Sequence, residues 1–420
     1  MEKLSGCRAA LARSIQTRIQ RAALAVGVLL LAWSASVEGQ TGLSNTNTAN
    51  AANDRLSAAP DTLRPQPRFT GAPLFFVQPE TGFAFGVGGV WFHRPRENVR
   101  AGKSLSTMTA AVLYTLRGQF IGEVRGQLFT DADRWRLNYH MGYYDYPYFF
   151  YGIGNDNPDN AEETYTNRFP LLDLTSLREV KGNFYAGLGV FLEHNRFSDL
   201  DTAGLLISGS VPGVEGGLNW GMGPRLLFDT RDNVNSAYRG WYLYSAVTFH
   251  REQLGSTQDY TNWELDTRTY LNLSRRDLVI DVAKKGVPPM FAPRSPTHIL
   301  AFQVYGNWVR GTAPFHRLAL FGGPDQMRGF LEGQDRDQLY LTAQTEYRFP
   351  IWRFVSGGAF LSAGQVQPSW QALNLADLAY SGGAGIRLQL SPKDRTLIRL
   401  DYAYGSFGGG GFYLQFRESF

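Results

Sequence analysis

The sequence has a single cysteine, Cys7, among its 420 residues, and no apolar run as long as the roughly 18 residues that a transmembrane helix needs. One cysteine forms no internal disulfide and no thiolate metal site. The mean hydropathy of −0.26, together with the lack of long apolar runs, excludes a bundle of membrane-spanning helices. Charged residues make up only 19% of the chain, which is too few for an intrinsically disordered protein.

Glycine and aromatic residues are abundant instead, with 46 glycines and 14% aromatics. This composition is typical of a transmembrane β-barrel, in which lipid-facing and lumen-facing side chains alternate and the average hydropathy stays low. In residues 378–390, for example, Tyr380, Ile386 and Leu388 alternate with Ser381, Gly383 and Arg387. The polar face contains many glycines and charges of both signs, which favours a hydrated lumen over the dry centre of a sandwich.

Sixteen segments of this kind, separated by clusters of Gly, Pro, Asn and Asp, fill residues 71–420. They predict an all-β fold, a 16-stranded antiparallel transmembrane β-barrel. The long connections at 144–161, 195–214, 310–337 and 365–375 are expected outside the cell, and the short turns in the periplasm. Residues 275–297 are the exception, because they form a long, proline-rich connection on the short-turn side, and their strand assignment stays open.

The first residues are typical of a secretory signal peptide. A basic stretch precedes the twelve-residue apolar run from Ala22 to Trp33, and small residues follow it. We therefore expect three regions: a signal peptide at 1–39, a flexible periplasmic lead-in at 40–68 and an outer-membrane barrel at 69–420. The leader holds three of the four net positive charges, so we expect no nucleic-acid partner.

Three segments resemble, in chain order, the BamA/TamA family of outer-membrane barrels, also called the bacterial surface antigen family. The first is a strand-turn motif containing Asp229, Arg231, Asp232, Asn233, Arg239 and Gly240. The second is a lumen-loop motif containing Gly322, Gly323, Met327, Arg328, Gly329 and Phe330. The third is the strand segment 346–350, and the chain ends on an aromatic residue, Phe420, which resembles the C-terminal signal of bacterial barrels.

The resemblance implies that the sixth extracellular loop folds back into the lumen, where its arginine pairs with acidic groups of the wall. The residues themselves support this, because glycines next to Arg328 allow sharp bends and its guanidinium forms two parallel bonds with carboxylates. The alternation along 341–348 places Glu346 on the lumen face as the natural partner. The family's second acidic position falls at Ser362, which has no charge, so the anchor is expected to be weaker or to recruit a different carboxylate. The alternative is that Arg328 is an exposed loop arginine.

The family's assembly and secretion proteins carry periplasmic POTRA domains before the barrel, whereas this sequence has only a short lead-in. The resemblance is therefore to a form without POTRA domains. The expected partners are outer-membrane lipid, client outer-membrane or exported proteins, and periplasmic chaperones or separate accessory proteins that replace those domains. The expected location is the bacterial outer membrane.

The sequence offers little catalytic chemistry. Its six histidines have no metal-ligand spacing, and no nucleophile elbow or phosphate loop is present. We expect no enzyme activity, no metal and no cofactor, and we interpret the aromatic run 143–151 as an interfacial girdle.

Three functions remain as hypotheses. The first is insertion, export or assembly of outer-membrane components, with a lateral seam between segments 71–78 and 411–420. The second is a passive or solute-specific pore whose selectivity is set by Arg225, Asp229, Arg231, Arg387, Arg399 and Asp401. The third is an outer-membrane lipase using His140 or His250, for which position is the only argument.

Overall fold

The computed structural model describes residues 68–78, 82–100, 104–116, 118–155, 162–202, 204–208, 211–274, 298–352, 354–391, 395–406 and 409–420. The expected signal peptide, nearly all of the lead-in and the open segment 275–297 lie outside these residues. No helix in the described part of the chain is long and apolar enough to cross a membrane.

Sixteen long strands form one antiparallel sheet. They are β1 (Arg68–Gln78), β2 (Gly82–His93), β3 (Ser106–Thr115), β4 (Phe120–Thr130), β5 (Trp135–Phe150), β6 (Glu163–Lys181), β7 (Phe184–Ser198), β8 (Gly217–Asp229), β9 (Gly240–His250), β10 (Tyr260–Asn272), β11 (Ile299–Gly311), β14 (Leu339–Trp352), β15 (Val355–Gln367), β16 (Ala379–Ser391), β17 (Thr396–Gly405) and β18 (Gly410–Phe416). The predicted number of strands and their order along the chain are confirmed.

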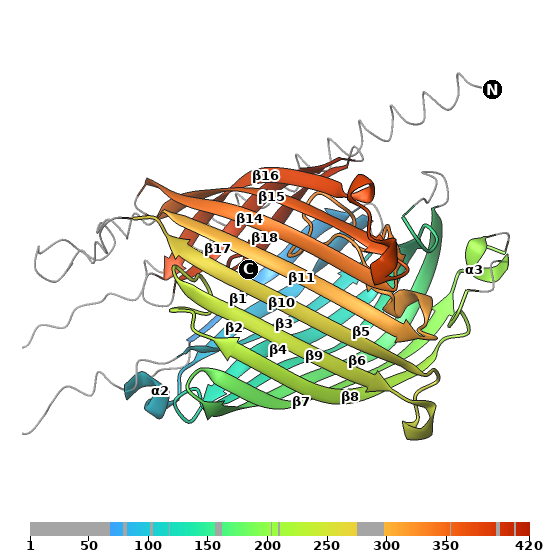
Figure 1. The fold of residues 1–420 in the computed structure, drawn as a ribbon, viewed down its shortest axis with the longest axis horizontal. Coiled ribbons are helices and arrows are strands. Elements are labelled where there is room, and N and C mark those ends of the chain that lie inside the picture. The colour runs from blue at the N-terminus through green and yellow to red at the C-terminus, as the bar shows by residue number, and fades with distance from the viewer. Residues whose placement is uncertain are drawn as a thin grey trace, which may run out of the picture.

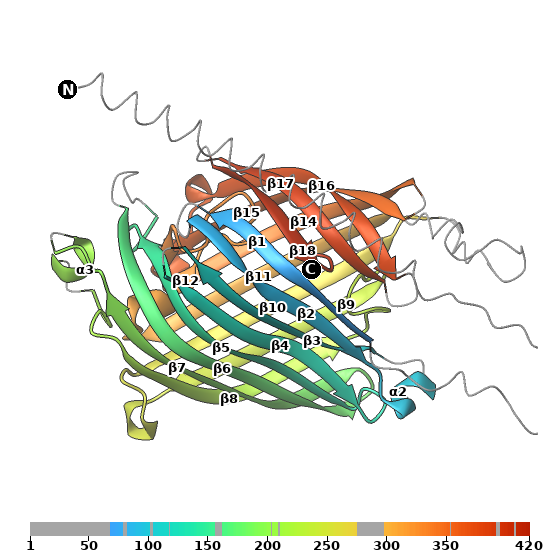
Figure 2. The same cartoon turned by 180° about the vertical axis from the view of Figure 1, so that it is seen from behind.

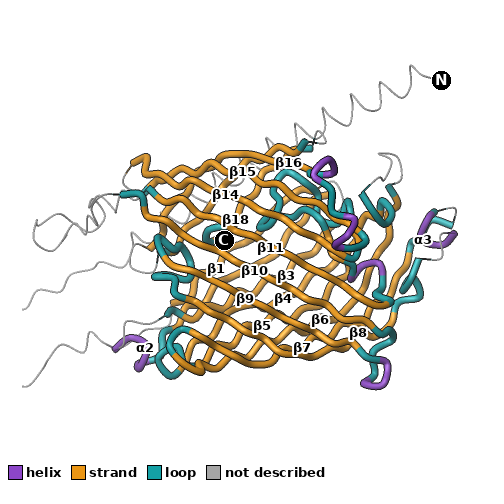
Figure 3. The backbone as a smooth tube through the Cα atoms, in the orientation of Figure 1, coloured by secondary structure: helices purple, strands orange, loops and turns teal. Residues whose placement is uncertain are grey.

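The remaining elements are short and lie in the connections. They are helices α2 (Arg96–Arg100) and α3 (Leu205–Ser208), the 3-10 turns η1 (Glu252–Leu254), η3 (Phe315–Arg317), η4 (Trp370–Ala372) and η5 (Leu375–Asp377), and the paired strands β12 (Ala319–Leu320) and β13 (Arg336–Asp337). Figure 3 shows the two helices at opposite ends of the barrel, with α2 at one end and α3 at the other.

The sheet curls into a barrel with strongly tilted strands (Figure 1). Neighbours in the sequence are neighbours in the sheet, and β11 pairs with β14 across the sixth extracellular loop. The blue first strand and the red last strands lie near one another in both views of the barrel (Figures 1 and 2). Among the described residues, the ladders run from β1 to β18 without one between these two strands.

The alternation of side chains explains why these segments form a barrel wall. On β8, Leu226 and Phe228 are 45% and 38% exposed, whereas Arg225 and Asp229 are 5% exposed. The apolar side chains therefore face outward and the charged ones face the lumen, as the sequence predicted. The same is true of β16, where Tyr380 and Ile386 are exposed and Arg387 is buried.

Two expectations about the strands are wrong. β5 continues to Phe150 instead of ending near residue 144. Tyr143 faces outward as a girdle residue would, but Phe150 is fully buried against Tyr165 and Phe315. The reason is that long loops cover this part of the wall and give its aromatic rings an apolar partner.

The second correction concerns the last strand. β18 ends at Phe416, not at Phe420, because Arg417 has a positive φ of 67° that turns the chain. Glu418, Ser419 and Phe420 are all buried. A continued strand would have carried the charged Glu418 along the wall, whereas the turn brings it to arginine partners in the lumen.

Candidate functional site

The sixth extracellular loop, residues 312–338 and called L6 below, folds inward and packs against the wall. Phe321, Met327 and Phe330 are buried together with Tyr340 of β14 and Val366 of β15. The two short strands of L6, β12 and β13, pair with each other and give the loop a hairpin-like stem. Apolar packing and this stem therefore hold the loop inside the barrel.

All three glycines of the loop motif are required by their backbone geometry. Gly322, Gly323 and Gly329 have φ angles of 98°, 95° and 103°, in the left-handed region that favours glycine. A Cβ on Gly329 would lie 2.9 Å from the carbonyl carbon of Tyr404, and its N–H donates to the hydroxyl of Tyr413 at 2.9 Å. The turn therefore lets L6 touch the backbone of β17 directly.

Arg328 is completely buried and is held by two strands. Its Nη2 lies 2.8 Å from Oε2 of Glu346 on β14, and its Nη1 lies 2.5 Å from Oδ2 of Asp401 on β17. All three side chains have 0% exposure. The guanidinium carbon also lies 3.4 Å from the centre of the Phe360 ring on β15, a cation–π contact. The expected pair of Arg328 and Glu346 is present, and the alternative of an exposed arginine is wrong.

Three further arginines surround the same carboxylates. Arg348 and Arg387 lie 2.8 and 3.1 Å from Glu346, and Arg387 and Arg399 lie 2.9 and 3.1 Å from Asp401. We call the set of Arg328, Arg348, Arg387 and Arg399 with Glu346, Asp401 and Glu418 the arginine cluster. Each buried charge has opposite charges in contact, which buried ions require.

Ser362 does not take part in the anchor. Its hydroxyl is buried and has no hydrogen-bond partner in the described structure. The carboxylate that the family pattern places there is supplied instead by Asp401, two strands further along the sheet. The sequence contained a usable signal, since the alternation along β17 already put Arg399 and Asp401 on the lumen face, but only the barrel's curvature brings Asp401 to L6.

The strand-turn motif builds the connection between β8 and β9. Asp229 accepts from Arg136 of β5 at 2.6 Å and from Arg231 at 2.9 Å. Asp232 accepts from the backbone N–H of Tyr238 and of Arg239. Asp229 therefore ties the turn to a distant strand, and Asp232 closes it.

The other motif residues complete this turn. Asn233 accepts from the backbone N–H of Asn235 and Ser236. Gly240 has a φ of 112°, and a Cβ there would meet the carbonyl oxygen of Thr230 at 2.4 Å. Arg395, from the turn before β17, donates to Asp232 at 2.8 Å. The motif is thus a hydrogen-bonded support at this end of the barrel.

The C-terminal residues join this support to the arginine cluster. Glu418 lies 3.3 Å from Nε of Arg387, and its backbone N–H donates to Asn235 of the turn. The Ser419 hydroxyl donates to the backbone oxygen of Asp325 in L6 at 3.1 Å. Sequence reasoning assigned Phe420 to a barrel signal and missed that residues 418–420, called the C-terminal tail below, bridge all three motif segments.

Phe420 itself fills an apolar site inside the barrel. Its ring packs against Ala237 of the turn and against Tyr270, Ile299 and Ala301 on β10 and β11. The backbone oxygen of Phe420 accepts from Nη2 of Arg348 at 2.8 Å. The tail is therefore held by both apolar packing and charge-assisted hydrogen bonds.

The histidines proposed for a lipase have other partners. His140 lies 2.8 Å from the Tyr144 hydroxyl and 3.5 Å from Glu123, and His250 stacks on Tyr260 at 4.0 Å. In the described residues, no group of three His, Cys, Asp or Glu side chains is placed to hold a metal ion. Within the described residues, neither histidine has a serine hydroxyl as a hydrogen-bond partner.

Comparisons with known proteins agree with this geometry. A family model for the Omp85 superfamily domain matches residues 129–416. A search of curated proteins finds no significant match.

Two solved structures share the fold at low sequence identity. BamA from Haemophilus ducreyi lacking POTRA domains 1-3 is similar, with a TM-score of 0.52 and 12% identity over 84% of this chain and 70% of that one. CdiB from Acinetobacter baumannii is similar with a TM-score of 0.50 and 12% identity over 83% of this chain, which spans 59% of CdiB. Identities this low establish the fold alone. The match over most of the barrel shows that the chain belongs to the Omp85 superfamily.

Proposed function

We propose that this barrel acts in the insertion, export or assembly of outer-membrane components and that it does so without enzymatic chemistry. The observation that carries the proposal is the fully buried Arg328, which L6 inserts between Glu346 and Asp401. A lumen filled in this way suits a barrel that handles clients at its wall and holds its loop as a plug. The superfamily membership supports the same class of function.

The proposed partners follow from this function. Client outer-membrane or exported proteins would meet the barrel at the seam between β1 and β18. β18 has only 7 residues whereas β1 has 11, so part of the first strand has no counterpart of equal length. Unpaired strand edges are templates for an incoming strand. Periplasmic chaperones or separate accessory proteins would deliver the clients.

The alternative of a passive pore has less support. That hypothesis needs Arg387, Arg399 and Asp401 to line an open path, but these side chains are buried and ion-paired to one another. Charges that neutralise each other in contact are poorly available to a passing ion. The alternative predicts a large, stable conductance from the purified protein.

Depletion of the protein followed by quantitative proteomics of outer-membrane fractions separates the two functions. We expect a subset of barrel or exported proteins to decline, and the wild-type gene to restore them. Arg328→Ala should fail to restore them, whereas Ser362→Ala, which alters an unpartnered hydroxyl at the same wall, should restore them fully. An unchanged outer-membrane proteome combined with high conductance would decide for the pore.

A further inference from the structure

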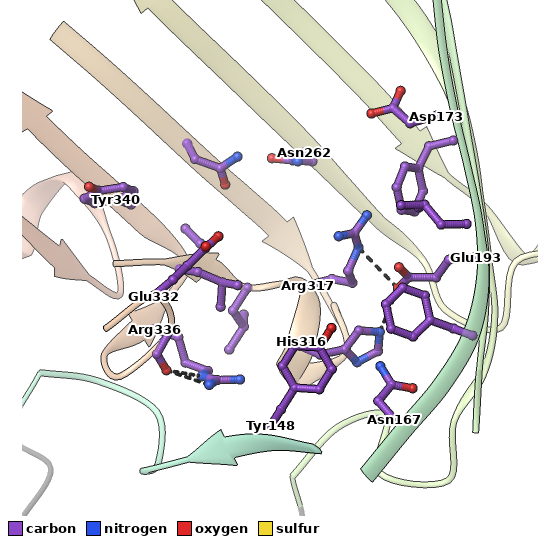
Figure 4. A pocket seen from close by; sticks show the side chains of 18 of the residues that line it. Tyr148, Asn167, Asp173, Glu193, Asn262, His316, Arg317, Glu332, Arg336 and Tyr340 are labelled. Atoms are coloured by element: carbon purple, nitrogen blue, oxygen red, sulfur yellow. Dashed lines mark hydrogen bonds and ion pairs between the residues drawn. The ribbon is translucent and has the colours of Figure 1, made fainter. Parts of the chain in front are cut away.

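A chamber of about 760 Å³ lies inside the barrel between L6 and the inner wall (Figure 4). His316 and Arg317 of L6 line one side, and Asp173, Asn262 and Glu264 line the wall. Arg328, Glu346 and Asp401 do not line it, so the chamber is distinct from the arginine cluster. Its volume falls within the roughly 300–1,000 Å³ of small-molecule sites in proteins.

Most carboxylates that face the lumen have a cationic partner in contact. This holds for Glu193, Asp229, Asp266, Glu346, Asp401 and Glu418. Asp173 and Glu264 differ, because among the described residues neither makes a hydrogen bond or an ion pair. The side-chain oxygen of Asn262 is also buried without a partner. The side chains of Asp173 and Glu264 are partly exposed to the chamber and the Asn262 oxygen is buried, so three acceptors line the chamber without a donor from the described residues.

A ligand that fits these three side chains has to donate several hydrogen bonds. Carboxyl and amide oxygens accept hydrogen bonds, and a ligand that supplies donors to them gains free energy. Hydroxyl groups and ammonium groups both meet this requirement. The remaining lining residues distinguish between these two kinds of ligand.

The charges that line the chamber nearly cancel. Asp173, Glu193, Glu264 and Glu332 are opposed by Arg225, Arg317 and Arg336. Arg225 and Arg317 act electrostatically on Asp173 without contacting it as an ion pair. A cationic amine gains little from such a balanced field, whereas a neutral ligand with many hydroxyls gains hydrogen bonds from either sign of charge.

Aromatic rings complete the wall. Tyr144, Tyr148, Tyr260 and Tyr305 are among the lining residues. Figure 4 shows the Tyr148 ring beside His316. A tyrosine offers an apolar ring next to a polar hydroxyl, which suits the alternation of C–H faces and hydroxyl edges on a sugar ring.

We propose that the chamber binds a short saccharide, with Asp173, Asn262 and Glu264 accepting hydrogen bonds from its hydroxyls. The same chemistry is present in the sugar head group of a surface glycolipid and in a free saccharide. The proposal does not depend on the assembly function, because it concerns residues outside the arginine cluster.

Saturation-transfer difference NMR on the full-length protein tests the proposal. The protein is kept in phosphocholine micelles, since a detergent with a sugar head group would compete for the chamber. The probes are maltose, chitobiose, the core oligosaccharide released from lipopolysaccharide by mild acid, and spermidine as the amine. We expect transfer to at least one saccharide and none to spermidine. Competition between the core oligosaccharide and the free disaccharides identifies the source.

Glu264→Leu removes two acceptor oxygens at similar volume and should weaken saccharide binding about tenfold or more, the usual effect of losing hydrogen bonds to a charged group. Glu252→Leu makes the same change in an exposed loop and should bind like the wild type. Asp173→Asn, which keeps the size, should weaken binding several-fold and serves as a second variant if Glu264→Leu does not fold. No transfer to any saccharide, transfer to spermidine alone, or equal binding by wild type and both chamber variants would overturn the proposal.

Discussion

Arg328 and Asp401 are 73 positions apart in the sequence, yet their side chains lie 2.5 Å apart inside the barrel. Because Glu346 holds the other side of the same guanidinium, the loop is fixed to β14 and β17 at once. Strands β15 and β16 lie between these two strands in the sheet. One loop side chain therefore connects two strands that are not neighbours in the sheet.

Arg328→Ala should release L6 from the wall. Removing one partner of a buried ion pair costs about 3–5 kcal/mol, because the remaining charges lose their compensation. Planar-bilayer recordings should show a higher leak conductance than for the wild type.

Asp401→Asn should also raise the conductance, but less than Arg328→Ala does, because the asparagine amide oxygen still accepts one hydrogen bond. Ser362→Ala should match the wild type, and an equal conductance for all four proteins would argue against an inward plug.

Gly329→Ala should destabilise L6 through both backbone strain and a clash with β17. Gly255 has a similar φ of 98°, but a Cβ there would meet nothing within 4 Å. Gly255→Ala therefore measures the strain alone, about 1–2 kcal/mol for a non-glycine residue in this region. Thermal unfolding followed by circular dichroism should show a clearly larger loss for Gly329→Ala. Equal losses would mean that the close approach to Tyr404 contributes nothing.

Phe420→Ala should lower the melting temperature by removing a ring from the apolar site of the C-terminal tail. Truncation of a buried phenylalanine typically costs about 3–5 kcal/mol. Phe412→Ala is the matched control, because Phe412 faces outward on β18 and is 45% exposed. If the two variants melted alike, the tail would not be held inside the barrel in the membrane protein.

Acidification should loosen the packing of L6 through His316. Burial lowers the pKa of this L6 imidazole below its ordinary value of 6.5, although Glu193 opposes the shift. At pH values between the folded-state pKa and about 6.5, the unfolded chain binds more protons than the folded one. The free energy of unfolding therefore falls as the pH drops below about 6.5. Melting at about pH 7.5 and about pH 5.5 should therefore differ more for the wild type than for His316→Gln. A variant with an unchanged pH dependence would assign the effect to other groups.

The repeating part of the fold was accessible to sequence reasoning. Side chains of a strand alternate between the two faces, so Arg225, Asp229, Arg387 and Glu346 were placed in the lumen correctly from local pattern alone. Strand number and order followed from the same pattern and from the turn residues. Arg328 and its pairing with Glu346 came from the loop motif and the alternation together.

The parts that the sequence did not reveal depend on three-dimensional curvature. Asp401 was known to face inward, but its contact with Arg328 requires the sheet to bend around L6. The inward turn after Phe416 depends on distant arginines, Arg348 and Arg387, that no local pattern connects to Glu418. The unpaired Asp173 and Glu264 likewise become visible only when the wall and the loop are seen together.

The C-terminal tail has a mechanical consequence for the end of the sheet. Its side chains contact Arg387 and the backbone of Asp325, and the backbone N–H of Glu418 donates to Asn235 of the turn. The last strand is therefore attached both to L6 and to the β8–β9 turn. Separating β18 from the wall would first require these hydrogen bonds and the ion pair to break. A load that separates β18 from the wall would therefore be transmitted through the tail to L6.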